Sequence, residues 1–136
     1  MGLDCYIVKG NRDEVFKDER LKDLTLTGGL FSGYGNGSFR GKCYEEFMAH
    51  LTASSPDFWH LEKDEVIQTD ELRIYGILLR EYIKDKGLED LPDDHIYKWK
   101  TPLHDAFTDF RVKELKDLAT LFEVAAENKC VMEAWW

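Results

Sequence analysis

A glycine-rich segment, residues 28–42, has the residue types best suited to ligand chemistry. It holds six of the ten glycines and ends in Arg40 and Lys42, directly before a predicted helix. Glycines let backbone amides point at an anion, and the N-terminus of a helix adds a positive end. We therefore name Tyr34, Arg40, Lys42 and Tyr44 as candidate ligand-binding residues for a phosphate or a carboxylate.

The same segment also fits a purely structural role. The nearest nucleotide-binding motif, the P-loop, needs glycine at position 36 and serine or threonine after its lysine. This chain has Asn36 and Cys43 at those positions, so nucleotide hydrolysis is not expected. In the structural alternative, Phe31, Tyr34 and Phe39 pack the loop onto the domain and no ligand binds.

A second group that could do chemistry surrounds His104 and Asp105, with His95 before it and Asp109 after it. It resembles the His-Asp pairs of metal-dependent phosphohydrolases, which also need a histidine and an aspartate from separate helices. Here all four residues crowd into one stretch, and no serine stands in a nucleophile elbow. We therefore name no catalytic residue, no metal and no cofactor, and we favour a protein that is not an enzyme.

Two adjacent tryptophans, Trp135 and Trp136, form the last candidate group. Neighbouring residues of a strand point to opposite faces, so only one of the two can enter a one-sided core. A large exposed aromatic side chain is a common anchor of protein interfaces. Both are therefore interface candidates, and the alternative that both are covered within the monomer stays open.

The elements that must position these residues follow from hydrophobic periodicity. Short runs of strand-forming residues predict strands at residues 3–8, 24–27, 96–99 and 130–135. Apolar residues at helical spacing predict three helices: residues 42–53, a second from Thr69 or Asp70 to Gly87, and residues 101–128, starting at Thr101-Pro102 with a break near Thr108.

Together these elements predict an α+β fold in which a small sheet, including both terminal strands, packs against about three helices. The length of 136 residues is typical of one domain, and 43% hydrophobic residues supply a core, so we expect a single domain over residues 1–136. Three scattered cysteines cannot form a disulfide framework, and we expect all three to be buried.

Charge and targeting signals narrow the function classes. The net charge is −9, and residues 43–136 carry the excess of acidic groups, so the surface repels nucleic-acid phosphates and we expect no direct nucleic-acid binding. No signal peptide and no apolar stretch of membrane-spanning length is found, so we expect a cytoplasmic protein without membrane contact.

Two short motifs, MGLDxY at residues 1–6 and SFRGKxY at residues 38–44, are similar to those of a loose set of short uncharacterised proteins of bacteria and their phages. In that set the helix after the second motif tends to end in a threonine-glycine pair, whereas here Thr52 is followed by Ala53. The resemblance implies an accessory protein of a phage or mobile element. It brings no activity and leaves every residue role open.

Three hypotheses about function result. The first is a non-enzymatic cytoplasmic interaction module that acts through a protein partner or as a homodimer. The second is a domain, with or without catalytic activity, that binds a small anionic ligand at the glycine-rich loop. The third is an acidic protein that imitates nucleic acid and occupies the channel of another protein.

Overall fold

The computed structural model describes residues 4–9, 16, 18–26, 38–54, 59, 66–101 and 106–135. Within these ranges the chain forms three α-helices and six β-strands, with short 3₁₀ turns at Glu19–Leu21 and Gly41–Cys43. In chain order the elements are β1 (Asp4–Lys9), β2 (Ser38–Arg40), α1 (Glu45–Leu51), β3 (Val66–Ile67), α2 (Thr69–Asp85), β4 (Ile96–Lys100), β5 (Phe107–Arg111), α3 (Val112–Glu127) and β6 (Cys130–Trp135).

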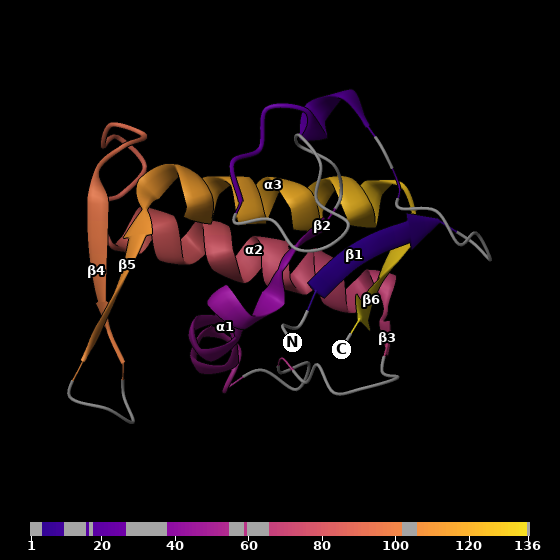
Figure 1. The fold of residues 1–136 in the computed structure, drawn as a ribbon, viewed down its shortest axis with the longest axis horizontal. Helices are drawn as coiled ribbons and strands as arrows, with labels where there is room; N and C mark the ends of the chain where they lie inside the picture. Colours follow the sequence, from indigo (N-terminus) through magenta and orange to yellow (C-terminus); the bar gives the residue numbers. More distant parts are fainter. Residues whose placement is uncertain are drawn as a thin grey trace.

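The larger of the two sheets has the strand order β2-β1-β6-β3, and all its neighbouring strands are antiparallel. Its central pair joins β1 to β6, with Ile7 opposite Met132, so segments from the two ends of the described chain lie side by side (Figure 1). This confirms the prediction that both terminal strands belong to one sheet. The α+β class, with about three helices packed on a small sheet, is confirmed as well.

The two long helices, α2 and α3, pack against each other and against the main sheet (Figure 1). Their contact is close because Gly76 of α2 has no side chain. A Cβ atom at that position would lie 3.2 Å from the Cγ atom of Glu123 on α3. Arg80, one turn further along α2, donates from two of its nitrogens to the Glu123 carboxylate and also to the Thr120 hydroxyl, which fixes the register of the helix pair.

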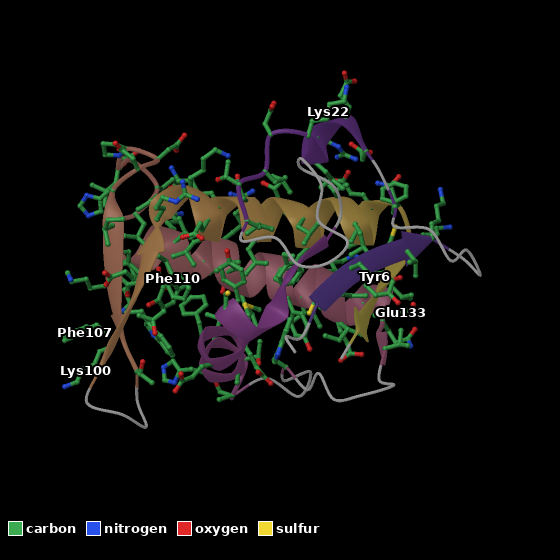
Figure 2. The ribbon with its side chains drawn as sticks, viewed as in Figure 1. Tyr6, Lys22, Lys100, Phe107, Phe110 and Glu133 are labelled. Atoms are coloured by element: carbon green, nitrogen blue, oxygen red, sulfur yellow. The ribbon has the colours of Figure 1, made fainter. Side chains whose placement is uncertain are left out.

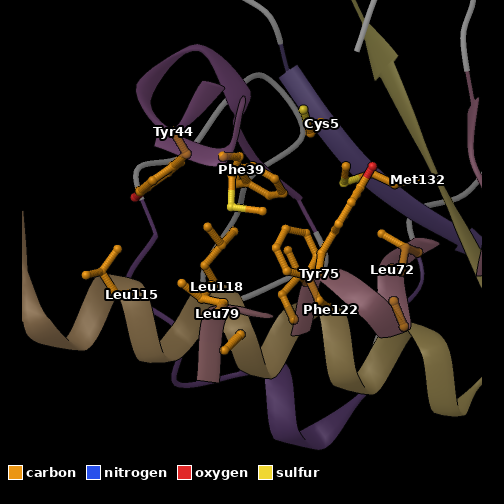
Figure 3. Packing of buried hydrophobic residues seen from close by; sticks show 14 of the residues in the cluster. Cys5, Phe39, Tyr44, Leu72, Tyr75, Leu79, Leu115, Leu118, Phe122 and Met132 are labelled. Carbon is orange, nitrogen blue, oxygen red and sulfur yellow. The ribbon is translucent and has the colours of Figure 1, made fainter. Parts of the chain in front are cut away.

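The hydrophobic core lies between the main sheet and this helix pair (Figure 3). The sheet contributes Ile7 and Met132, and the helices contribute Leu72, Tyr75 and Phe122, all fully buried. Burying a large apolar side chain contributes about 1.5–3 kcal/mol, so this layer is the main source of stability.

The predicted limits of α2 are partly right. Gly87 follows the helix with a φ of +67°, a left-handed conformation that suits glycine, and it ends the helix as predicted. The predicted caps, Thr69 and Asp70, are wrong. Gln68 is the N-cap, and its backbone N–H donates to the Glu71 carboxylate at 3.2 Å. The Thr69 hydroxyl instead donates to the carbonyl oxygen of Cys130 at 2.6 Å, which ties α2 to β6.

The strand predicted at residues 24–27 is wrong for residues 24–26, and Thr27 lies outside the described residues. The reason is a side-chain partner on α3. Both the backbone N–H and the hydroxyl of Thr25 donate to the Asp117 carboxylate, at 2.8 and 3.1 Å. The amide that a strand would pair with another strand is therefore bonded to a helix.

The third predicted helix begins too early in the sequence. Phe107–Arg111 forms β5, and the helix begins only at Val112, while residues 102–105, including Pro102, lie outside the described residues. Phe107 and Phe110 are three residues apart, as on a helix, but Phe107 is exposed and Phe110 is buried. The Glu114 carboxylate accepts a hydrogen bond from the Arg111 backbone N–H at 2.8 Å, which starts the helix there.

Two smaller expectations are also corrected. Residues 38–42 were expected to belong to a loop, but Ser38–Arg40 pairs with β1 as a strand. Cys5 and Cys130 are buried as expected, whereas Cys43 is exposed. The first helix is confirmed over Glu45–Leu51. Among the residues that can be described, no helix has the length and apolar composition of a membrane span.

Candidate functional site

The residues predicted from the sequence to bind a ligand or partner are only partly visible. Tyr34 and Trp136 lie outside the described residues, as does most of the glycine-rich loop. Arg40 of β2 and Trp135 of β6 both stand opposite Asp4 of β1 in the register of the main sheet. The fold thus places Arg40, a ligand candidate, and Trp135, an interface candidate, at the same level of the sheet, on the two strands that flank β1.

Tyr44 is a core residue. Its hydroxyl donates a hydrogen bond of 3.0 Å to the buried Glu114 carboxylate of α3, and its ring stacks on Phe110 with a centroid distance of 5.9 Å. Lys42 lies in the 3₁₀ turn that precedes it. The described contacts of Tyr44 are those of a residue that joins α1 to α3, and its role toward a ligand stays a prediction.

The histidine and aspartate group is divided between described and undescribed residues. His104 and Asp105 lie outside the described part, while the backbone carbonyl of His95 accepts a hydrogen bond from Val112, and Asp109 pairs with Lys98 at 3.7 Å. Within the described ranges, no cluster of three or more histidine, cysteine, aspartate or glutamate residues could hold a metal ion.

A different feature emerges at the end of the helix pair that lies away from the main sheet. There, β4 and β5 form an antiparallel hairpin that connects α2 to α3 (Figure 1). Backbone hydrogen bonds close it at both ends, from Thr101 to Ala106 at 3.0 Å and from Val112 to His95 at 2.9 Å. The hairpin is a two-stranded sheet of its own and shares no ladder with the main sheet.

One face of the hairpin packs on the body of the protein. The rings of Trp99 and Phe110 each meet Phe47 of α1 edge-on, at 5.3 Å. Tyr97 forms a short hydroxyl to hydroxyl hydrogen bond with Tyr82 of α2. Burial, together with this hydrogen bond, raises the pKa of Tyr82 above its usual value. This aromatic cluster anchors the hairpin to both α1 and α2.

The other face of the hairpin, here called the outer hairpin face, points to solvent. Its residues alternate in sequence with the anchored ones and face each other in pairs: Ile96 with Arg111, Lys98 with Asp109, and Lys100 with Phe107. Phe107 is 61% exposed and Ile96 is 47% exposed. Figure 2 shows Phe107 and Lys100 together near the tip of the hairpin, with Phe110 on the side of the body.

Exposed apolar side chains of this size are rare in the described structure. Ile77 is the other one, and it lines a shallow groove of about 350 Å³ between α2 and α3. The rest of that groove is mostly charged, and several of its side chains are already paired, such as Arg73 with Asp70. The outer hairpin face differs because two apolar side chains share it with Lys98, Lys100 and one carboxylate, Asp109, while the Arg111 side chain turns to the Thr25 carbonyl and to Glu114.

This face was not predicted from the sequence, because residues 107–111 were assigned to a helix. In the sequence only residues 96–100 show a period of two, with Tyr97 and Trp99 alternating with Lys98 and Lys100; residues 107–111 alternate between exposed and packed positions only in the structure. No protein-family model, curated protein or solved structure is significantly similar to this chain, and the site is interpreted from its own geometry.

Proposed function

We propose that this chain is a non-enzymatic cytoplasmic interaction module that binds a protein partner through the outer hairpin face. The observation that carries the proposal is the exposure of Phe107 and Ile96 on one face of a projecting hairpin, beside Lys98 and Lys100. Aromatic residues surrounded by polar side chains are the usual anchors of protein interfaces.

The hairpin is also well prepared for binding. Its opposite face is held by Trp99, Phe110 and the Tyr82–Tyr97 hydrogen bond, so the strands do not need to become ordered when a partner arrives. A preordered surface loses less conformational entropy on association and therefore binds more tightly for the same contacts.

A protein is favoured over a nucleic acid by the charge beside the hairpin. The turn that leads into β4 carries four exposed acidic residues, Glu89, Asp90, Asp93 and Asp94. These carboxylates repel a phosphate backbone, which is charged at every nucleotide, more strongly than a short protein segment whose few charges lie directly against the lysines. The three cysteines are scattered along the chain and form no disulfide framework, which fits a reducing compartment and supports the cytoplasmic location. The resemblance to bacterial and phage proteins further supports an accessory role.

The test compares two substitutions of exposed apolar residues. A random-peptide display library is selected on the wild-type protein, and the enriched peptides are then titrated against Phe107→Ser and against the matched control Ile77→Ser. Loss of an interface anchor weakens binding by about tenfold or more, equivalent to ~1.4 kcal/mol, so we expect this loss for Phe107→Ser alone. Peptides that bind both variants as well as the parent would show that the partner docks elsewhere.

A further inference from the structure

The first strand of the hairpin, β4, has an open backbone edge. The hydrogen bonds that close it involve Thr101 and His95, so these residues bond toward β5. Antiparallel strands alternate between bonded and non-bonded pairs. The residues of β4 between His95 and Thr101 therefore alternate between bonded and non-bonded positions. Ile96, Lys98 and Lys100 are the non-bonded ones and direct their backbone N–H and C=O groups away from β5. Within the described chain, β4 pairs with no other strand.

The two edges of the hairpin are not equivalent. Figure 1 shows that the strands cross toward the tip and that, at the base of the hairpin, β5 lies on the side of α3 and β4 on the far side. The N–H group of Arg111, which points outward from β5, already donates to the Glu114 carboxylate at 2.8 Å. The described structure provides no such acceptor or donor for the outward groups of Ile96 and Lys98. The β4 edge is therefore open at Ile96 and Lys98, whereas the β5 edge is closed at Arg111, where the strand leads into α3.

We propose that the partner binds by strand addition, in which an extended acidic segment pairs antiparallel with β4 as a third strand of the hairpin. This inference rests on the proposed function and names its binding mode. In strand addition the main-chain hydrogen bonds supply affinity, and alternate side chains supply specificity. Both components are present here, because the open edge and the exposed side chains belong to the same residues of β4.

The chemistry of the added strand follows from the side chains next to it. Residues opposite Lys98 and Lys100 stand two apart on one face of the added strand, where carboxylates form favourable cross-strand pairs. The residue opposite Ile96 is best apolar. The existing Lys98 pair with Asp109 spans 3.7 Å and is more than half exposed on both sides, so it contributes little and leaves Lys98 able to contact a second carboxylate.

A second copy of this chain is a poor occupant of the same edge. Antiparallel pairing of β4 with itself about Lys98 would place Lys98 opposite Lys98 and Ile96 opposite Lys100. Like charges directly opposite each other are destabilising, and lysines on an exposed edge oppose edge-to-edge association. Charge complementarity thus selects an acidic segment over self-association.

The experiment uses the full chain and a defined probe, the peptide acetyl-Thr-Glu-Thr-Glu-Thr-Val-Thr-amide. In the proposed register the two glutamates and the valine bond to β4, and the threonine amides point away from it. N-methylation of both glutamate amides is expected to weaken binding by about tenfold or more, because it removes ladder donors. N-methylation of two threonine amides is the matched control and should leave the affinity within about twofold. Binding is followed by NMR, with the amides of Ile96 and Lys98 shifted and protected from hydrogen exchange.

Variants of the protein test the same contact from the other side. Lys98→Pro removes an outward N–H without removing a bond to β5, and it should lose binding like the methylated peptide. Lys98→Gln keeps the amide and removes the charge, so a smaller loss is expected. If Lys98→Pro does not fold, the two methylated peptides on the wild-type protein decide alone.

The outcomes separate the two proposals. Equal affinity of the glutamate-methylated and threonine-methylated peptides, combined with loss of binding in Phe107→Ser, would overturn strand addition and leave the outer hairpin face as the binding surface. If the acidic peptide shifts none of the NMR signals of the β4 amides, the proposal that an acidic segment occupies this edge is wrong. Insensitivity of binding to both Phe107→Ser and methylation would overturn the strand addition and the proposed function together.

Discussion

The main sheet and the hairpin use the same kind of strand for different purposes. In the main sheet, β1 and β6 place Cys5, Ile7, Cys130 and Met132 in the core, where none of these side chains is exposed. In the hairpin only one face is packed, and the other carries the most exposed large apolar side chain described, Phe107. Residues that stabilise the fold and residues available for binding are therefore separated, even within one short strand.

The strongest test of this separation is a pair of substitutions in β5. Phe110→Ala is expected to cost about 3–5 kcal/mol of the free energy of unfolding, because it leaves a cavity between α1 and the hairpin. Phe107→Ala, at an exposed position, should change that free energy by no more than about 0.5 kcal/mol. Urea denaturation of both variants measures the difference. Similar costs at the two positions would contradict the assignment of packed and free faces.

A smaller effect is expected where the hairpin strand leads into α3. Tyr44→Phe removes the hydroxyl that donates to Glu114, and a buried carboxylate that loses one donor costs about 1–3 kcal/mol. Combined with Glu114→Gln in a double-mutant cycle, the two changes should show an interaction energy above about 0.5 kcal/mol. Simple additivity of the two costs would indicate that the contact does not stabilise the fold.

The contact between the hairpin and α2 should appear as a pH dependence. Burial and the bond to Tyr97 raise the pKa of Tyr82, so the folded state keeps a proton that the unfolded state releases above its ordinary pKa of 10.0. Its contribution is therefore complete below that pH and is lost as the pH rises. We expect Tyr82→Phe to reduce the loss of stability between about pH 9 and pH 12. If stability falls equally with pH in the parent and the variant over this range, the raised pKa of Tyr82 is contradicted.

The least perturbing test concerns the thiols. Cys43 is exposed, whereas Cys5 and Cys130 are fully buried, and burial raises the pKa of the Cys130 thiol. A thiol reagent should therefore label Cys43 in the native protein and all three cysteines after denaturation, with little loss of stability from the first label. Mass spectrometry counts the labels. Native labelling of Cys130 at the rate of Cys43 would show that the main sheet opens as readily as its surroundings.

The sequence predicted a strand correctly where the hydrophobic pattern of a segment matches the position of that segment in the fold. Residues 3–8 and 130–135 are short, apolar runs, and the strands observed there, β1 and β6, form the centre of a sheet, so both strands could be predicted. Residues 107–111 could not, because Phe107 and Phe110 have helical spacing and only pairing with β4 makes them a strand. The outer hairpin face exists only because β5 pairs with β4, so it could not be predicted from the sequence either.

Contacts between distant residues explain the remaining differences. The role of Tyr44 depends on Glu114, which is 70 residues further along the chain. Thr25 is held out of a strand by Asp117, 92 residues away. Local patterns carry no information about such partners, so a residue that looks available for a ligand can be committed to the core.

The central position of β1 and β6 also has a kinetic consequence. Helix α2, the hairpin and α3 are contiguous in sequence, so their mutual contacts, such as those of Arg80 with Thr120 and Glu123, join residues only 40 and 43 positions apart and can form early in folding. The main sheet must wait until segments from opposite ends of the described chain meet, and closing so long a loop is entropically costly. Folding rates fall as contacts become less local. We therefore expect a partly folded helical unit to precede the sheet, with the β4 edge already complete while β1 and β6 are still unpaired.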